Sequence, residues 1–131
     1  MIIDTSAMLA VALREPDGRR YLKAILVAMP RRISVSNWLE ATMVVDRRGN
    51  TQAVDWLEDL IQQAEIEVMP VSVSQGEIAR RAWRTYGRGI HPARLNYGDC
   101  FAYALAKEAR ELLLFKGNDF AQTDIEPALK D

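Results

Sequence analysis

The sequence has few of the residues that most often form cross-links or reactive centres. Its 131 residues include one cysteine and one histidine. A disulfide needs two cysteines, so Cys100 excludes an internal disulfide and fits a reducing cytoplasm. His91 falls in a predicted loop, where we expect it at the surface or in contact with a phosphate group. These scarcities point away from disulfide-stabilised folds and from catalysis by a histidine base.

Long hydrophobic runs and an excess of charge of one sign are also lacking. No apolar run approaches the roughly 20 residues that a membrane span needs, and the segment 1–4 lacks the basic start of a signal peptide. Seventeen basic and 18 acidic residues give a net charge of −1, so no overall field indicates a nucleic-acid partner. About half of the chain is apolar, with 49% hydrophobic residues. We therefore expect one soluble cytoplasmic domain, residues 1–131, without membrane association.

The apolar residues follow alternating strand and helix patterns. Strands are predicted at 1–4, 33–36, 66–72 and 112–115, and helices directly after Thr5 and at 19–29, 38–48, 51–64, 74–86 and 98–110. Strands that are separated by helices form parallel sheets with helices on both faces. Pro70 indicates that the third strand lies at an edge. We predict an α/β fold with a central parallel sheet of four or five strands.

Four acidic residues, Asp4, Glu40, Asp99 and Asp119, lie beside predicted strand ends. Ligands of open parallel sheets bind at the edge where the strands end. Four carboxylates cannot share a dry cleft unless a cation neutralises them. An all-oxygen set favours Mg²⁺ or Mn²⁺. The four acids therefore predict a metal site that also carries catalysis.

Each acid also has a purely structural explanation. Asp4 could cap the helix that follows it, and Glu40 lies three residues after Asn37, which is the spacing of a capping box. Asp99 in the first turn of a helix interacts favourably with the helix dipole, and Asp119 could belong to a turn. The convergence of all four at one sheet edge is what favours the metal site.

Small polar residues stand next to these acids. They are Thr5, Ser6, Asn96 and Asn118. Such residues can orient carboxylates or metal-bound water. They can equally serve as helix caps or turn residues, and both interpretations stay open.

A basic segment precedes the third acid. It contains Arg80, Arg81, Arg84, Arg88, His91 and Arg94 and no acidic residue, and Trp83 and Tyr86 lie among them. Arginine beside aromatic rings suits phosphate contacts and base stacking on single-stranded RNA. The alternative is a solvated helix face with Trp83 packed inward.

Four segments together resemble PIN-domain ribonucleases, and specifically VapC-type toxins of toxin–antitoxin pairs. They are residues 1–7, 36–41, 95–106 and 113–125. The resemblance implies an α/β/α sandwich, usually a homodimer, with Mg²⁺- or Mn²⁺-dependent endonuclease activity on RNA, and by analogy on tRNA. It also implies a VapB-like antitoxin that covers the acidic pocket.

The resemblance places Asp4, Glu40, Asp99 and Asp119 on the acidic positions of the family. The fourth position varies among relatives. Asn118 stands where many of them have an acid, and Asp124 is a nearby alternative to Asp119.

Two other functions remain open at this point. A receiver-like signalling domain also uses acids at strand ends and a lysine, for which Lys116 would be the candidate, but it has paired acids after its first strand. A binding module without catalysis could hold a partner's basic segment in the same pocket. The apolar faces of segments 22–29 and 54–61 are candidates for a dimer interface.

Overall fold

Four short parallel strands form the centre of the computed structural model, which describes residues 1–130; the predicted domain, 1–131, ends one residue beyond them. The strands are β1 (Ile2–Ile3), β2 (Arg32–Ser34), β3 (Glu67–Met69) and β4 (Leu113–Leu114). Their order is β3-β2-β1-β4, and all the pairings are parallel. The predicted parallel sheet is confirmed with four strands, and β3 lies at an edge as Pro70 indicated.

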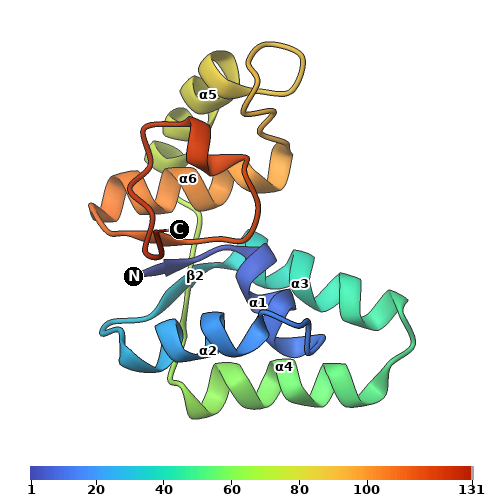
Figure 1. Ribbon diagram of the computed structural model, residues 1–131. Coiled ribbons are helices and arrows are strands. Elements are labelled where there is room, and N and C mark those ends of the chain that lie inside the picture. The colour runs from blue at the N-terminus through green and yellow to red at the C-terminus, as the bar shows by residue number, and fades with distance from the viewer. Residues whose placement is uncertain (131) are drawn as a thin grey trace.

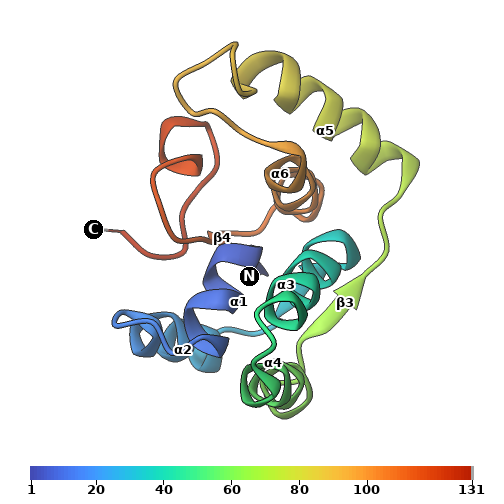
Figure 2. The same cartoon turned by 90° about the vertical axis from the view of Figure 1, so that its right-hand side faces the viewer.

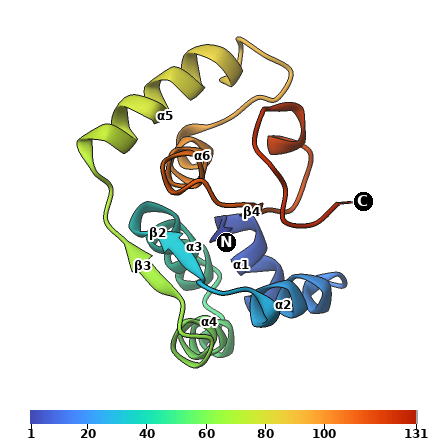
Figure 3. The same cartoon turned by 90° about the vertical axis from the view of Figure 1, so that its left-hand side faces the viewer.

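Helices cover both faces of the sheet (Figure 1). One layer consists of α1 (Thr5–Ala12), α2 (Gly18–Val27), α3 (Val35–Arg47) and α4 (Thr51–Gln63). The other layer contains α5 (Val73–Tyr86) and α6 (Tyr97–Ala109), and a short 3₁₀ helix, η1 (Phe120–Gln122), follows β4. Figure 3 shows the two layers on either side of the strands. The α/β/α sandwich is confirmed.

The alternation of side chains along the strands divides the core in two. Ile3 and Leu114 point into the cluster that α1 to α4 form, whereas Ile2 and Leu113 point into the cluster under α5 and α6. All four side chains are fully buried. Because successive strand residues face opposite sides, two residues per strand suffice to anchor both layers.

The strands are shorter than the apolar patterns suggested, and one helix begins earlier. The third strand covers 67–69 and not 66–72, and α3 begins at Val35 and not near Trp38. Ser34 ends β2 and also caps α3, with its hydroxyl oxygen accepting from the Ser36 amide at 3.3 Å. The chain therefore turns from strand to helix without a loop at this point.

The strands of a parallel sheet end at one common edge, and this edge faces the viewer in Figure 2. The chain leaves β1 and β2 there to begin α1 and α3, and α6 begins beside them. Side chains at these helix starts therefore meet although they are distant in the sequence. Within residues 1–130, no helix is long and apolar enough to cross a membrane.

Candidate active site

Asp4 sits at the end of β1 and caps α1. Its side chain is only 4% exposed, and its Oδ2 atom accepts from the amide of Ser6 at 3.0 Å and from the Ser6 hydroxyl at 2.6 Å. The same hydroxyl oxygen accepts from the Lys116 amide at 2.9 Å, just after β4. Ser6 thus fixes the Asp4 carboxylate relative to two neighbouring strands.

Asp99 is the third residue of α6 and belongs to a capping box with Asn96. The Asp99 amide donates to Oδ1 of Asn96 at 2.9 Å, and Oδ2 of Asp99 accepts from the Asn96 amide at 2.9 Å. The capping explanation for Asp99 is therefore present in the structure. It does not compete with a role in the site, because the cap holds the carboxylate at the start of α6 next to the other acids.

The capping-box explanation for Glu40 is wrong. Ser34 caps α3, so Glu40 is the sixth helical residue and not the third. Its carboxylate lies against Gly98 of α6: a Cβ atom built on Gly98 would come within 2.6 Å of Oε2 and 2.8 Å of Oε1. The absence of a side chain at position 98 thus lets Glu40 reach the start of α6, one residue before Asp99.

Asp119 and Asp124 occupy different surroundings. Asp119 is exposed before η1, makes no capping hydrogen bond, and adds to the electrostatic repulsion on Asp99. Asp124 accepts from the Tyr103 hydroxyl at 2.6 Å and pairs with Lys107 at 2.7 Å, which lowers its pKa. Of the two candidates for the fourth position, Asp119 is the one whose charge acts on Asp99. Asn118 is exposed, beside Phe115 and Gly117.

The four acids share one electrostatic environment. Burial raises the pKa of Asp4 to about 6, and the Glu40 carboxylate adds to the rise. Burial also raises the pKa of Asp99 to about 7, with further contributions from Asp4, Asp119 and Glu40. The four acids proposed from the sequence therefore lie within electrostatic range of one another. Their mutual repulsion is what a bound cation would relieve.

The donor set fits a hard divalent cation, although the side chains are not already arranged around one. Among residues 1–130, no three histidine, cysteine, aspartate or glutamate side chains lie close enough together to hold a metal ion. Asp4 and Asp99 are fixed by their hydrogen bonds, whereas Glu40 and Asp119 are exposed. The two exposed side chains can turn toward a cation that the two fixed ones hold.

Asn37 lies near the acids but was not recognised from the sequence as part of this arrangement. Asn37 is fully buried, and its Nδ2 donates to the Gly98 carbonyl at 3.0 Å. The backbone carbonyl of Asn37 accepts from the Thr5 hydroxyl at 3.1 Å. Asn37 therefore connects the starts of α1, α3 and α6. The Thr5 hydroxyl acts through this contact, and the Thr5 backbone amide helps to stabilise the ionised Asp4 carboxylate.

The basic segment does not form one continuous surface. Arg80 lines a pocket between α5 and α6, whereas Arg81 lines a second pocket with Tyr103 and Asp124. Consecutive helix positions are about 100° apart, so neighbouring arginines face different sides.

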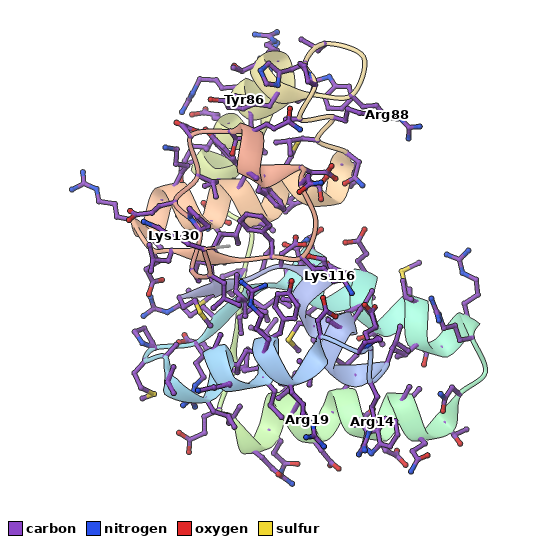
Figure 4. The ribbon with its side chains drawn as sticks, in the orientation of Figure 1. Arg14, Arg19, Tyr86, Arg88, Lys116 and Lys130 are labelled. Carbon is purple, nitrogen blue, oxygen red and sulfur yellow. The ribbon has the colours of Figure 1, made fainter. Side chains whose placement is uncertain are left out.

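The remaining basic residues of this segment lie toward and after the end of α5. Arg84 lies in the last turn of α5. Arg88, His91 and Arg94 line a shallow hollow of the loop that follows, and Arg88 points outward in Figure 4. The Nδ1 atom of His91 accepts from the Ala93 amide at 3.0 Å.

Lys116 does not point freely into the acidic site. Its Nζ atom pairs with Glu15 and, at 2.8 Å, with Asp17, both in the turn between α1 and α2. These hydrogen bonds raise the pKa of Lys116. Figure 4 shows Lys116 between the two helical layers. A receiver-like role for this lysine therefore has no support in the geometry.

Comparisons with known proteins agree with the fold. The PIN domain family matches residues 1–126. Ribonuclease VapC28 of Mycobacterium tuberculosis is 45% identical over 130 residues, covering 98% of each chain.

Two solved structures share the fold. VapC20 of M. tuberculosis, described as a sarcin–ricin loop cleaving toxin, has a TM-score of 0.75 and 15% identity, covering 95% of both chains. A toxin–antitoxin complex from Klebsiella pneumoniae has a TM-score of 0.70 and 17% identity, covering 94% of this chain and 92% of the other. The chain belongs to the PIN-domain family and, within it, to the VapC ribonucleases of toxin–antitoxin pairs.

Proposed function

We propose that Asp4, Glu40, Asp99 and Asp119 hold Mg²⁺ or Mn²⁺ and that RNA is hydrolysed at this site. The observation that carries the proposal is that the charges of Asp4, Glu40 and Asp119 all act on Asp99, whose pKa is raised to about 7 by burial first and by this repulsion in addition. A chain that keeps carboxylates in such an unfavourable arrangement gains from a cation that neutralises them. The VapC relatives are ribonucleases, and the cluster of four acids, called the acidic cleft below, is the place in this chain that suits hydrolysis of RNA.

The residues divide into two pairs by what they do. Asp4 and Asp99 are held by hydrogen bonds from Ser6 and Asn96, so they supply fixed oxygen ligands. Glu40 and Asp119 are exposed and complete the ligand set on the solvent side. A bound divalent ion supplies an activated water and neutralises charge on the phosphate. This division explains how a site with four acids can fold before the ion binds.

We further propose tRNA as the substrate, with Arg84, Arg88, His91 and Arg94 contacting its phosphates. These side chains lie in the last turn of α5 or in the loop that leads into α6, where Asp99 is. Arginine contacts with phosphate are sequence-independent and position the backbone. The support is adjacency to the acids.

We propose a VapB-like antitoxin as the partner of this chain, because toxins of this family pair with antitoxins. An arginine from such a partner would satisfy the same carboxylates that otherwise hold the cation. We also propose a homodimer. The end of α2 leaves Leu26, Val27 and Met29 exposed, whereas Leu57 of α4 packs into the protein's own core, so segment 22–29 is the better interface candidate.

Substitution of one acid tests the proposed site. Asp99→Asn keeps an oxygen that can accept from the Asn96 amide but removes the charge, so RNA cleavage in Mg²⁺ or Mn²⁺ should fall by roughly 100-fold or more. Asp124→Asn is the matched control, because Asp124 is held by Tyr103 and Lys107 outside the acidic cleft. Its cleavage rate should stay close to that of the wild type.

Chelation of divalent ions by EDTA should stop cleavage by the wild type. Unchanged cleavage in EDTA would contradict the role of the metal. Equal losses for Asp99→Asn and Asp124→Asn would contradict the assignment of the site. A chain that binds RNA but never cleaves it would favour the alternative, a binding module without catalysis.

A further inference from the structure

An apolar pocket between α5 and α6 has no part in the site described above. It has a volume of about 460 Å³, which lies within the usual range of small-ligand pockets. Its walls include the aromatic rings of Trp83, Tyr97 and Phe101, with Cys100 beside them and Arg80 as the charged member. An exposed apolar recess of this size often marks a binding site.

The aromatic rings are exposed and yet held in place. Trp83 is 41% exposed and Tyr97 is 78% exposed. The Tyr97 ring packs edge-on against Phe101, with centroids 4.8 Å apart. The Trp83 ring lies against the backbone at Gly87, where a Cβ atom would come within 2.7 Å of the ring. Rigid exposed rings can stack on a ligand at little cost in side-chain entropy.

The charge of the pocket suits an anionic occupant. None of the residues that line it is acidic. Arg80 is the charge at the pocket. An aromatic ring system that carries a phosphate would match both the apolar walls and the arginine.

The position of the pocket connects it to the acidic cleft. Tyr97, Gly98 and Asp99 are consecutive residues in the first turn of α6. Tyr97 lines the pocket, Gly98 contacts Glu40, and Asp99 belongs to the acidic cleft. Figure 2 looks onto the start of α6, with α5 on one side of it and α3 and α1 on the other. An RNA strand that crosses this helix start can reach both sites.

We propose that this pocket receives an unpaired nucleobase of the RNA substrate, next to the phosphodiester that the acids bind. The base stacks on Trp83 and Tyr97, and Arg80 contacts a neighbouring phosphate. This inference rests on the proposed function of the acidic cleft and extends it, because it makes a single-stranded segment a requirement of the substrate.

Gly76 offers a way to close the pocket without disturbing the residues that line its walls. It lies on α5 at the pocket, and a Cβ atom built on it meets nothing within 4 Å. Gly76→Phe should therefore fill the recess, whereas Gly76→Ala leaves it open and is compatible with the helix. Trp83→Ala removes one of the stacking surfaces directly. Thermal melting of each variant shows that it is folded.

The experiment measures binding of a fluorescent single-stranded RNA of random sequence by anisotropy in EDTA, where no cleavage occurs. Loss of a stacked base weakens binding roughly 5- to 100-fold. Trp83→Ala and Gly76→Phe should show this loss and Gly76→Ala should not. The wild type should also prefer RNA to a ribose-phosphate chain of the same length without bases, and Gly76→Phe should lose this preference.

Equal RNA binding by Gly76→Phe and Gly76→Ala would overturn the inference. So would a Gly76→Phe variant that binds RNA normally but escapes neutralisation by the antitoxin, because the occupant would then be a protein. The two proposals can fail separately. If the wild type preferred RNA with bases but did not cleave it in Mg²⁺ or Mn²⁺, the proposed function would be wrong and the pocket proposal would stand. If Gly76→Phe bound and cleaved RNA normally, the pocket proposal would be wrong and the proposed function would stand.

Discussion

Asp4 and Asp99 are largely withdrawn from water, although an ionised carboxylate is most stable when fully hydrated. Each gains compensation from a helix start: Asp4 accepts from the Ser6 amide, and Asp99 accepts from the Asn96 amide. The compensation is incomplete, because both pKa values lie above that of a free aspartate. The remaining imbalance predicts how the metal-free protein responds to pH.

The metal-free protein should be more stable at pH 6 than at pH 8. A carboxyl group whose pKa is raised by folding binds more protons in the folded state, so the free energy of unfolding falls as the pH rises from the unfolded pKa through the folded one. For Asp4 and Asp99 this window runs from 3.8 to about 6 and about 7. The pKa values of Asp17 and Asp124 are lowered, so their contribution to the free energy of unfolding changes only at a pH below this window.

Thermal melting in EDTA at pH 6 and pH 8 measures this effect. The melting temperature of the wild type should drop by several degrees at the higher pH, and Asp99→Asn should reduce the drop. A wild type that is equally stable at both values, or more stable at pH 8, would contradict the electrostatic description of the cleft.

A substitution of Gly98 tests the position of Glu40, because the missing side chain at position 98 leaves room for the Glu40 carboxylate. Gly98→Ala would place a Cβ atom about where the Glu40 carboxylate now lies. The end of a glutamate side chain moves easily, so the fold should persist while metal binding weakens. We expect cleavage to fall roughly 10- to 100-fold at limiting Mn²⁺ and to recover partly at high Mn²⁺.

Gly76→Ala is the matched control for Gly98→Ala. Both are helical glycines, but a Cβ atom at position 76 meets nothing within 4 Å. Both variants should melt near the wild-type temperature or above it. Equal cleavage by the two variants would mean that the contact between Glu40 and Gly98 has no bearing on the site.

At the scale of elements, the sequence predicted which segments are strands and which are helices better than where each begins. The start of α3 was missed because Ser34 serves as both the last strand residue and the cap. With the cap assigned to Asn37, the link between α3 and α6 could not be seen. One available signal was that a polar residue, Asn37, lies only three positions after the end of the buried strand β2.

Asn37→Ala should separate this positioning role from simple stability. The substitution removes the donor to the Gly98 carbonyl, so the free energy of unfolding should fall by about 1–3 kcal/mol. Cleavage should also decrease, because Asn37 holds the start of α6 beside α3. Chemical denaturation and RNA cleavage, both measured below the melting transition, give the two quantities.

Asn50→Ala is the control for a loss of stability alone. Asn50 caps α4 and accepts from the Ala53 amide at 3.1 Å, and it forms no part of the acidic cleft. Loss of this cap should lower the free energy of unfolding by about 1 kcal/mol and leave RNA cleavage unchanged. If Asn37→Ala cleaved RNA as well as Asn50→Ala, Asn37 would have only a structural role.

The basic segment shows the limit of reading a surface from a sequence. Arg80 and Arg81 are neighbours in the chain but line different pockets. The basic character of the segment could be recognised from the sequence. The direction of each arginine side chain could not, because it depends on how α5 packs on α6. The same packing created the aromatic pocket, whose members Trp83 and Tyr97 come from different helices.

At the scale of the molecule, the parallel sheet explains why Asp4, Glu40 and Asp119 come to one edge from distant segments, whereas Asp99 comes from the start of α6 beside that edge. Strand order β3-β2-β1-β4 places β1 between β2 and β4, so the residues that follow these three strands lie side by side. This convergence followed from the alternation of strands and helices, and it could be predicted without side-chain detail. The positions of Glu40 and Asp119 relative to a metal could not be predicted in this way, because both side chains are exposed and can adopt several orientations.

The most direct test of the central claim is a crystal structure of the protein soaked in Mn²⁺, with anomalous scattering used to locate the ion. We expect an anomalous peak within coordination distance of Asp4 and Asp99, with Glu40 and Asp119 turned toward it. A cleavage-competent protein whose only Mn²⁺ peak lies away from these carboxylates would contradict the account.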